Sequence, residues 1–207
     1  MFYREAGQYA SSYAQDRQLL PLRQDKLGML ILMAIGFAAT PIWASDYWIS
    51  AIMIPWLILA LVALGQNILM GYAGQLSLGS AGFMAVGAFA CYNLILRVPG
   101  IPFIGAVILS GLIAAGIGIL FGLPSLRIRG LYLAVATLAS QFFIVWCLDK
   151  FGWFKNYDTS GIINAQAIVI FGQTMNTPAE KYMVVLVIVG LMTWMAANMA
   201  QGSIGRG

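Results

Sequence analysis

The stretch Gly71-Tyr-Ala-Gly-Gln-Leu-Ser-Leu-Gly-Ser-Ala-Gly-Phe83 decides how this chain folds. It lies within fifty consecutive residues, 47–96, that contain no Asp, Glu, Lys or Arg. About twenty helical residues span the hydrocarbon core of a bilayer, so this run is too long for one crossing. Its glycines and polar residues predict a break between two crossings. Such irregular backbone is tolerated at membrane depth only where it is buried in protein or lines a polar cavity.

The composition of the whole chain supports a membrane protein. Hydrophobic residues make up 61% of the 207 residues and charged residues only 9%, against roughly 25% charged in a soluble domain. We therefore predict an all-α fold, a polytopic transmembrane helical bundle with about six crossings. The expected crossings are 27–44 (interrupted at Pro41), 47–70, 76–96, 103–123, 131–148 and 182–200.

The basic residues predict the orientation of these crossings. With a cytoplasmic N-terminus, seven Lys and Arg residues fall on the inner side and four on the outer side, as the positive-inside rule expects. We also expect residues 1–26 to form a cytoplasmic tail. The inner residues are Arg4, Arg17, Arg23, Lys26, Arg127, Arg129 and Arg206, and the outer ones Arg97, Lys150, Lys155 and Lys181.

Seven residues are candidates for lining a pathway through the membrane. Glycine permits bends and close backbone approach, and the alternative is that small residues only let helices pack. Thr137 and Gln141 lie four residues apart on one helical face, where interhelical hydrogen bonding is the alternative. Bulky replacements such as Gly74→Leu or Gly79→Leu should block the pathway. The candidates are Gly71, Gly74, Gln75, Ser77, Gly79, Thr137 and Gln141.

Other features favour packing or docking roles. Gly111/Ala115 and Gly118/Gly122 form small-xxx-small pairs, for which helix packing is the expected role. Cys91 and Cys147 lie near the outer ends of crossings, where a disulfide is conceivable but apolar filling is favoured. The long outer segment 149–181 is expected to hold a short surface helix or a docking platform built on its aromatic residues.

Catalysis is not expected. The chain has no histidine, its crossings carry no ionisable carboxyl or amine, and no Walker A sequence is present. An acid–base or metal constellation therefore cannot form within the crossings. We expect no enzyme activity, no metal, no cofactor and no nucleic-acid partner.

Two motifs carry a resemblance to a known family. Gly71-Tyr-Ala-Gly-Gln-Leu-Ser-Leu-Gly79 and Leu126-Arg-Ile-Arg-Gly-Leu-Tyr-Leu-Ala134 resemble the M-type permease subunit of branched-chain amino acid ABC importers. Weaker matches follow at Thr159-Ser-Gly161 and Gly205-Arg-Gly207. The resemblance covers roughly residues 50–207. Residues 27–207 would then form a transmembrane permease domain.

The resemblance implies partners and a location. Such a permease pairs with a homologous second permease subunit, two cytoplasmic ABC ATPase subunits and a periplasmic solute-binding protein, in the bacterial inner membrane. Family members continue beyond the Gly-Arg motif, so we expect this chain to be incomplete at its C-terminus. Ser80 stands where the family commonly has histidine, and Ser160 where it has a second glycine. The substrate therefore stays open between branched-chain amino acids, urea, short amides and aromatic acids.

Two rival functions remain at this point. A secondary carrier, or a half-unit of one, usually has an ionisable residue inside the membrane, and the predicted crossings have none. A purely structural membrane subunit would leave the glycine-rich break without a role.

Overall fold

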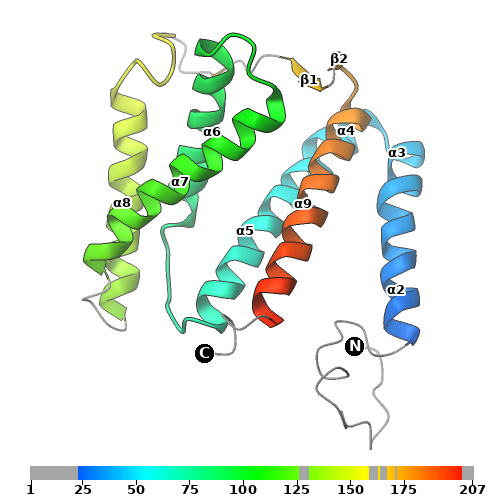
Figure 1. Ribbon diagram of the computed structural model, residues 1–207, viewed down its shortest axis with the longest axis horizontal. Coiled ribbons are helices and arrows are strands. Elements are labelled where there is room, and N and C mark those ends of the chain that lie inside the picture. The colour runs from blue at the N-terminus through cyan, green and yellow to red at the C-terminus, as the bar shows by residue number, and fades with distance from the viewer. Residues whose placement is uncertain (1–22, 126–130, 159–162, 164–166, 171, 202–207) are drawn as a thin grey trace, which may run out of the picture. The chain divides into compact units, whose positions relative to one another are not determined.

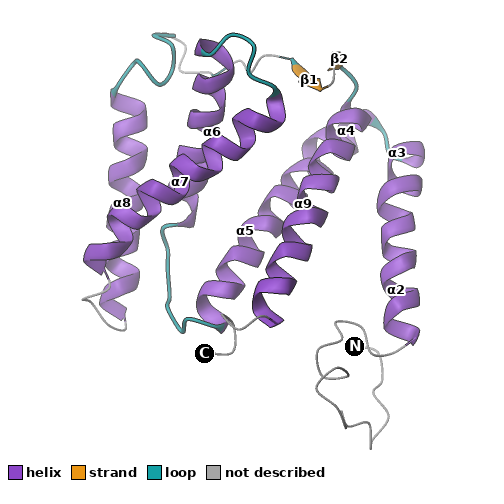
Figure 2. Ribbon diagram, viewed as in Figure 1, coloured by secondary structure: helices purple, strands orange, loops and turns teal. Residues whose placement is uncertain are grey.

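The computed structural model describes residues 23–125, 131–158, 163, 167–170 and 172–201, and is helical over most of them (Figures 1 and 2). The chain divides into two compact units, residues 1–61 with 177–207, and residues 62–176. The elements are α2 (Arg23–Ala34), η1 (Ile35–Ala39), α3 (Thr40–Trp43), α4 (Asp46–Trp48), η2 (Ile49–Met53), α5 (Ile54–Gly71), α6 (Ser80–Arg97), α7 (Phe103–Ser125), α8 (Leu131–Lys150), β1 (Ile168–Ile170), β2 (Gln173–Met175) and α9 (Pro178–Gln201).

Within the described residues, five helices are long and apolar enough to cross a membrane, which confirms the polytopic helical fold. They are Asp46–Gly71, Ser80–Arg97, Phe103–Leu123, Tyr132–Lys150 and Pro178–Ala200. The first predicted crossing corresponds to a shorter apolar helix, Lys26–Ala38. The third begins at Ser80 rather than near residue 76, because the break extends up to that point.

Two π-helical segments, η1 and η2, each end just before a proline. The N–H of Thr40 donates to Ile35 O, and the N–H of Ile54 donates to Ile49 O. The following residues, Pro41 and Pro55, offer no N–H, and a proline ring crowds the carbonyl four residues back. A π turn inserts one extra residue and relieves that conflict. The expected interruption at Pro41 is therefore a bulge inside a continuous helical stretch, residues 23–43.

Each unit has its own small core. In the first, Ile49, Leu57 and Tyr182 are buried together, and the Tyr182 hydroxyl donates to Gly36 O at 3.2 Å. In the second, α6 packs against both α7 and α8, around buried Val86 and Ile144.

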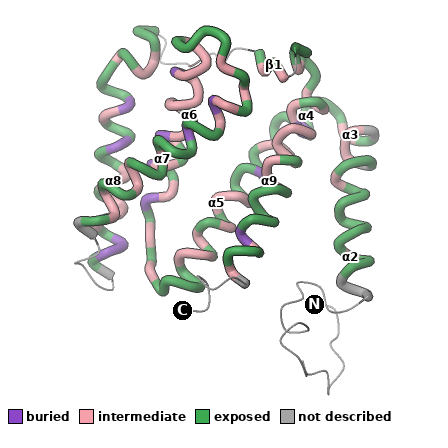
Figure 3. Tube along the Cα trace, viewed as in Figure 1, coloured by how far each residue is buried: buried purple, intermediate pink, exposed green. Residues whose placement is uncertain are grey.

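Most of the helical surface is exposed (Figure 3). On α7 the exposed side includes Leu112 and Ile119, which are 64% and 61% accessible. A surface this apolar would be unfavourable in water and suits contact with lipid or with other membrane helices. The chain is therefore a multi-pass membrane protein.

The outer segment contains a hairpin in place of the expected surface helix. β1 pairs antiparallel with β2, with Ile170 opposite Gln173, and Gly172 in the connection has φ +82°. The described residues of the segment, 149–158, 163, 167–170 and 172–181, form the end of α8, turns, this hairpin and the start of α9. An apolar β-branched run followed by glycine was the missed signal. Residues 159–161, part of the weaker family match, lie outside the described residues.

The two cysteines are free thiols, one on α6 and one on α8. Of the small residues on α7, a side chain at Gly118 would meet the Phe83 ring at 3.9 Å, whereas Gly111 faces open space. Within the described residues, only part of that small-residue face packs against this chain.

Candidate functional site

The glycine-rich break is non-helical, as predicted. Helix α5 ends at Gly71 and α6 begins at Ser80, and Tyr72–Gly79 between them has no helical turn (Figure 2). Gly74 has φ +61°, a left-handed conformation that glycine adopts without the steric cost of a Cβ.

The end of the break lies beside the interior of α8. The N–H of Leu78 donates to Thr137 Oγ1 at 3.0 Å, across 59 residues of sequence. Thr137 is six residues into this 20-residue helix, or about 9 Å along its axis at 1.5 Å per residue. Because α8 is long and apolar enough to span a membrane, this part of the break lies beside the interior of a candidate span and not beside its end.

Two glycines allow the start of α6 to approach α8 closely. A Cβ at Gly79 would lie 3.0 Å from the backbone oxygen of Thr137, and one at Gly82 would lie 3.1 Å from Gln141 Cα. Both glycines are buried. Thr137 and Gln141 thus share one face of α8, as predicted, and that face is turned toward the break and the first turn of α6.

The structure adds Gln66, which the sequence analysis missed. Its Nε2 donates to the backbone oxygen of Ser77 at 2.8 Å, so α5 holds the break from a second side. Its Oε1 is buried and has no hydrogen-bond partner within the described part of the chain. The available signal was the pair of amides Gln66-Asn67 in an otherwise apolar helix, little more than one turn before Gly71.

The other predicted site residues have more local surroundings. Gly71 is the last residue of α5, and Gly74 is exposed with no atom near the position of a Cβ. The N–H of Gln75 donates to Leu69 O at 3.2 Å. Ser77 Oγ accepts from the N–H of Gly79 at 3.3 Å. Their roles in a pathway stay predictions.

The arrangement offers neutral hydrogen-bonding groups and no charge. Amides, hydroxyls and the backbone groups released by the break are available, whereas the segment 72–79 has no ionisable group apart from the Tyr72 phenol. Among the described residues, no cluster of His, Cys, Asp or Glu could hold a metal ion. The chemistry that fits is hydrogen bonding to a small polar molecule.

A second organised region joins the outer end of α6 to the loop after α8. Asn93 is buried and donates to Phe89 O at 2.9 Å and to Phe154 O at 3.0 Å. Arg97 donates to Asn93 Oδ1 at 2.9 Å and to Trp153 O at 2.7 Å. Its guanidinium also lies 4.1 Å from the centre of the Trp153 ring, a cation–π contact.

This outer loop, residues 151–158, has a defined shape. Tyr157 has φ +58°, its N–H donates to Gly152 O at 2.8 Å, and its side chain is 74% exposed. Lys155 forms an ion pair with Asp149. Phe154 packs inward against the core of the second unit, so the aromatic residues of the expected docking platform do not all point outward.

Comparison with known proteins places the chain in a family. A family model for the branched-chain amino acid transport system permease component matches residues 48–206. Two relatives, the high-affinity branched-chain amino acid transport system permease proteins LivM of Salmonella typhimurium and Escherichia coli, are each 42% identical over 82 residues. These matches cover 40% of this chain and 19% of each relative, so the chain spans about a fifth of their length. No solved structure matches the chain significantly. Because the family model covers most of the sequence, the chain belongs to the permease-component family of branched-chain amino acid transport systems.

Proposed function

We propose that this chain is a permease subunit of an ABC importer in the bacterial inner membrane. It forms part of the translocation pathway for branched-chain amino acids or a related small polar solute. The observation that carries the proposal is the break Tyr72–Gly79, which is held against the interior of α8. Non-helical backbone at membrane depth is tolerated only where it is buried in protein or lines a polar path.

The neutral lining suits a transporter powered by other subunits. A charged residue inside a membrane helix is costly and usually marks ion coupling. Energy in this proposal comes instead from two cytoplasmic ABC ATPases, and a homologous second permease subunit completes the pathway. The polar groups of the break then need only exchange hydrogen bonds with a solute that passes through.

A periplasmic solute-binding protein would dock on the outer loop, residues 151–158. Arg97 and Asn93 hold the backbone of this loop in place, while Trp153 and Tyr157 are 46% and 74% exposed. Exposed aromatic side chains on a preformed backbone are typical anchors of a protein interface. Tyr157 is the residue expected to contact the partner most directly.

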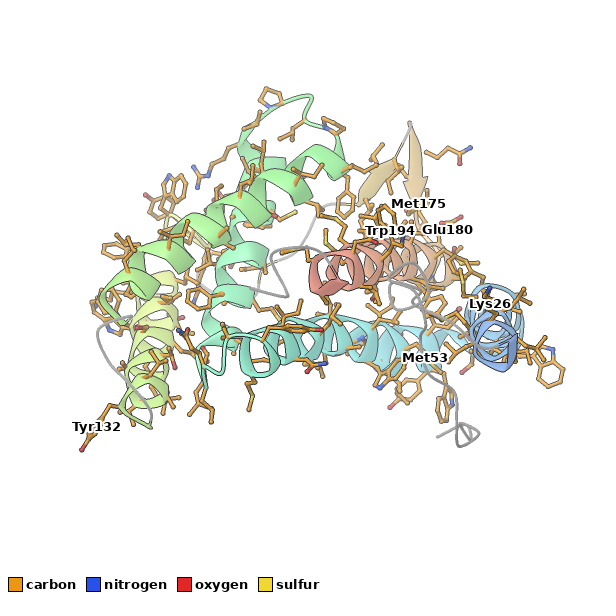
Figure 4. The ribbon with its side chains drawn as sticks, turned by 60° about the horizontal axis from the view of Figure 1, so that its bottom comes forward. Lys26, Met53, Tyr132, Met175, Glu180 and Trp194 are labelled. Atoms are coloured by element: carbon orange, nitrogen blue, oxygen red, sulfur yellow. The ribbon has the colours of Figure 1, made fainter. Side chains whose placement is uncertain are left out.

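The proposed orientation predicts which ends of α8 can be labelled from outside. Tyr132, in the first turn, is 79% exposed and projects away from the helix (Figure 4), and Tyr157 follows the last turn. In a background without Cys91 and Cys147, Tyr157→Cys should react with an impermeant thiol reagent in intact cells. Tyr132→Cys should react only after the membrane is permeabilised. Labelling of Tyr132→Cys in intact cells would reverse the orientation.

The transport function is tested with the intact permease and its genomic neighbours. The permease should co-purify with an ABC ATPase, and vesicles containing the complex should accumulate radiolabelled leucine, isoleucine or valine only with ATP and a loaded solute-binding protein. Urea, a short amide and an aromatic acid, each supplied with the same binding protein, test the solute class. ATP-independent uptake driven by an ion gradient would instead establish a secondary carrier.

A further inference from the structure

We infer that Gln66 and Thr137 are positioning residues that together clamp the break and set how readily it moves during transport. The inference rests on the proposed transport function and assigns a role within it to one residue, Gln66, that no motif indicates. Two hydrogen bonds support it. One is made by a side chain of α5 and the other by a side chain of α8, and their partners are neighbouring residues of the break.

The first bond comes from α5. Gln66 Nε2 donates to Ser77 O at 2.8 Å, which fixes the carbonyl of a residue that has no helical partner for it. The second bond comes from α8, where Thr137 Oγ1 accepts from the N–H of Leu78 at 3.0 Å. The two bonds therefore hold the two sides of a single peptide unit, the one that joins Ser77 to Leu78.

The Thr137 side of the clamp is itself held in place. The Thr137 hydroxyl donates to Ala134 O at 2.9 Å, so its oxygen is oriented to accept from Leu78. The backbone oxygen of Thr137 also faces Gly79 at the position where a Cβ would be too close. The two hydrogen bonds therefore hold Ser77 and Leu78, and the next residue, Gly79, is the one that packs closely against α8.

Only one of the two polar atoms of the Gln66 side-chain amide has a hydrogen-bond partner within the described residues. Its Oε1 is buried without a partner within the described residues, and an unmade hydrogen bond on a buried acceptor offsets much of what the Nε2 bond contributes. A hold of this kind is weak enough to release when the neighbouring helices shift. This is the property required of a segment that must rearrange in each transport cycle.

The clamp can be tested by thiol labelling of the break, without measuring transport. The reporter is Leu76→Cys, at a side chain that is 47% exposed, in the intact permease with Cys91→Ala and Cys147→Ala. Gln66→Leu removes the amide, and Thr137→Val removes the hydroxyl at nearly constant shape. Thr137→Val should raise the labelling rate about 3- to 10-fold, the factor that corresponds to one ordinary hydrogen bond. Gln66→Leu should raise it by a smaller factor, about 2- to 3-fold, because it also removes the unsatisfied Oε1.

Two matched variants control for nonspecific effects on α8. Thr137→Ser keeps the hydroxyl and should label within about twofold of the reporter alone. Ser140→Ala removes a hydroxyl that bonds to Ala136 O within the same helix, and it should also leave the rate unchanged. The double variant Gln66→Leu with Thr137→Val should deviate from additivity, since both bonds act on one peptide unit.

A transport measurement then separates positioning from folding. Per assembled complex, Gln66→Leu and Thr137→Val should lower the maximal uptake rate at least about 3-fold. The concentration of loaded binding protein at half-maximal rate should stay within twofold. Thr137→Ser should restore the rate. A residue needed only for folding would reduce the amount of complex and leave the rate per complex unchanged.

Two outcomes would overturn the inference. Labelling rates equal to those of Ser140→Ala, in complexes that assemble normally, would show that the two residues do not hold the break. Faster labelling with an unchanged uptake rate per complex would show that the clamp has no part in transport. Failure of the unaltered complex to transport would instead refute the proposed function, and the labelling result does not depend on it.

Discussion

Permease complexes carrying Gly79→Leu are expected to lose at least nine-tenths of their uptake activity. The Cβ alone would lie 3.0 Å from the Thr137 backbone oxygen and 3.4 Å from the Phe83 ring, and backbone cannot move aside as a flexible side chain can. Overpacking of this kind typically costs about 1–3 kcal/mol. Displacing α8 would also break the Leu78–Thr137 hydrogen bond, for a further loss of about 0.5–1.5 kcal/mol. Uptake in vesicles at matched expression measures the effect.

Gly74 provides the matched control for Gly79. Its Cβ position is open, and the only constraint is φ +61°, a conformation that costs most L-residues about 1–2 kcal/mol but that asparagine adopts comparatively often. Gly74→Asn should therefore transport near normally, and Gly74→Leu should be weakened by backbone strain without any clash. Normal transport by Gly79→Leu would mean that the close contact with α8 is unimportant for the pathway.

The second large effect is expected at Asn93. Asn93→Leu removes two donated bonds and the acceptor for Arg97 Nε, inside a site that is 6% exposed. Neutral hydrogen bonds contribute about 0.5–1.5 kcal/mol and those to charged groups about 1.5–3 kcal/mol, so we expect a loss of about 2–4 kcal/mol. The thermal unfolding midpoint of the purified complex should fall. Stimulation of its ATPase by loaded binding protein should fall as well.

Two further variants separate the shape of the outer loop from its contacts. Arg97→Lys keeps the charge but loses the fixed geometry of the guanidinium, so it should produce a milder form of the Asn93→Leu effect. Tyr157→Ala alters an exposed side chain and should weaken stimulation with an unchanged unfolding midpoint. If Asn93→Leu leaves both the midpoint and the stimulation unchanged, the loop is not organised by this network. If Tyr157→Ala leaves stimulation unchanged, the docking assignment fails.

The membrane fold could be predicted from composition and charge spacing. Charge-free windows located five crossings to within a few residues, because the bilayer requires long apolar helices whatever the details of packing. The break was predictable for a similar reason, since glycine, serine and glutamine lower helical propensity in a run that is otherwise apolar. The hairpin after α8 was missed because its strands are only three residues long, too short for a clear strand pattern in the sequence.

The sequence by itself determined the membrane class, the positions of the five long helices, the family and the position of the break. Only the tertiary structure decided what the break touches. Thr137 is 59 residues away from Leu78 in the chain, and no helical period or local spacing relates one to the other. The same holds for the hydrogen bonds that Gln66, Asn93 and Arg97 donate to the backbone carbonyls of Ser77, Phe154 and Trp153. Every residue has such a carbonyl, so these partnerships leave no mark in the sequence and are set by how the helices pack.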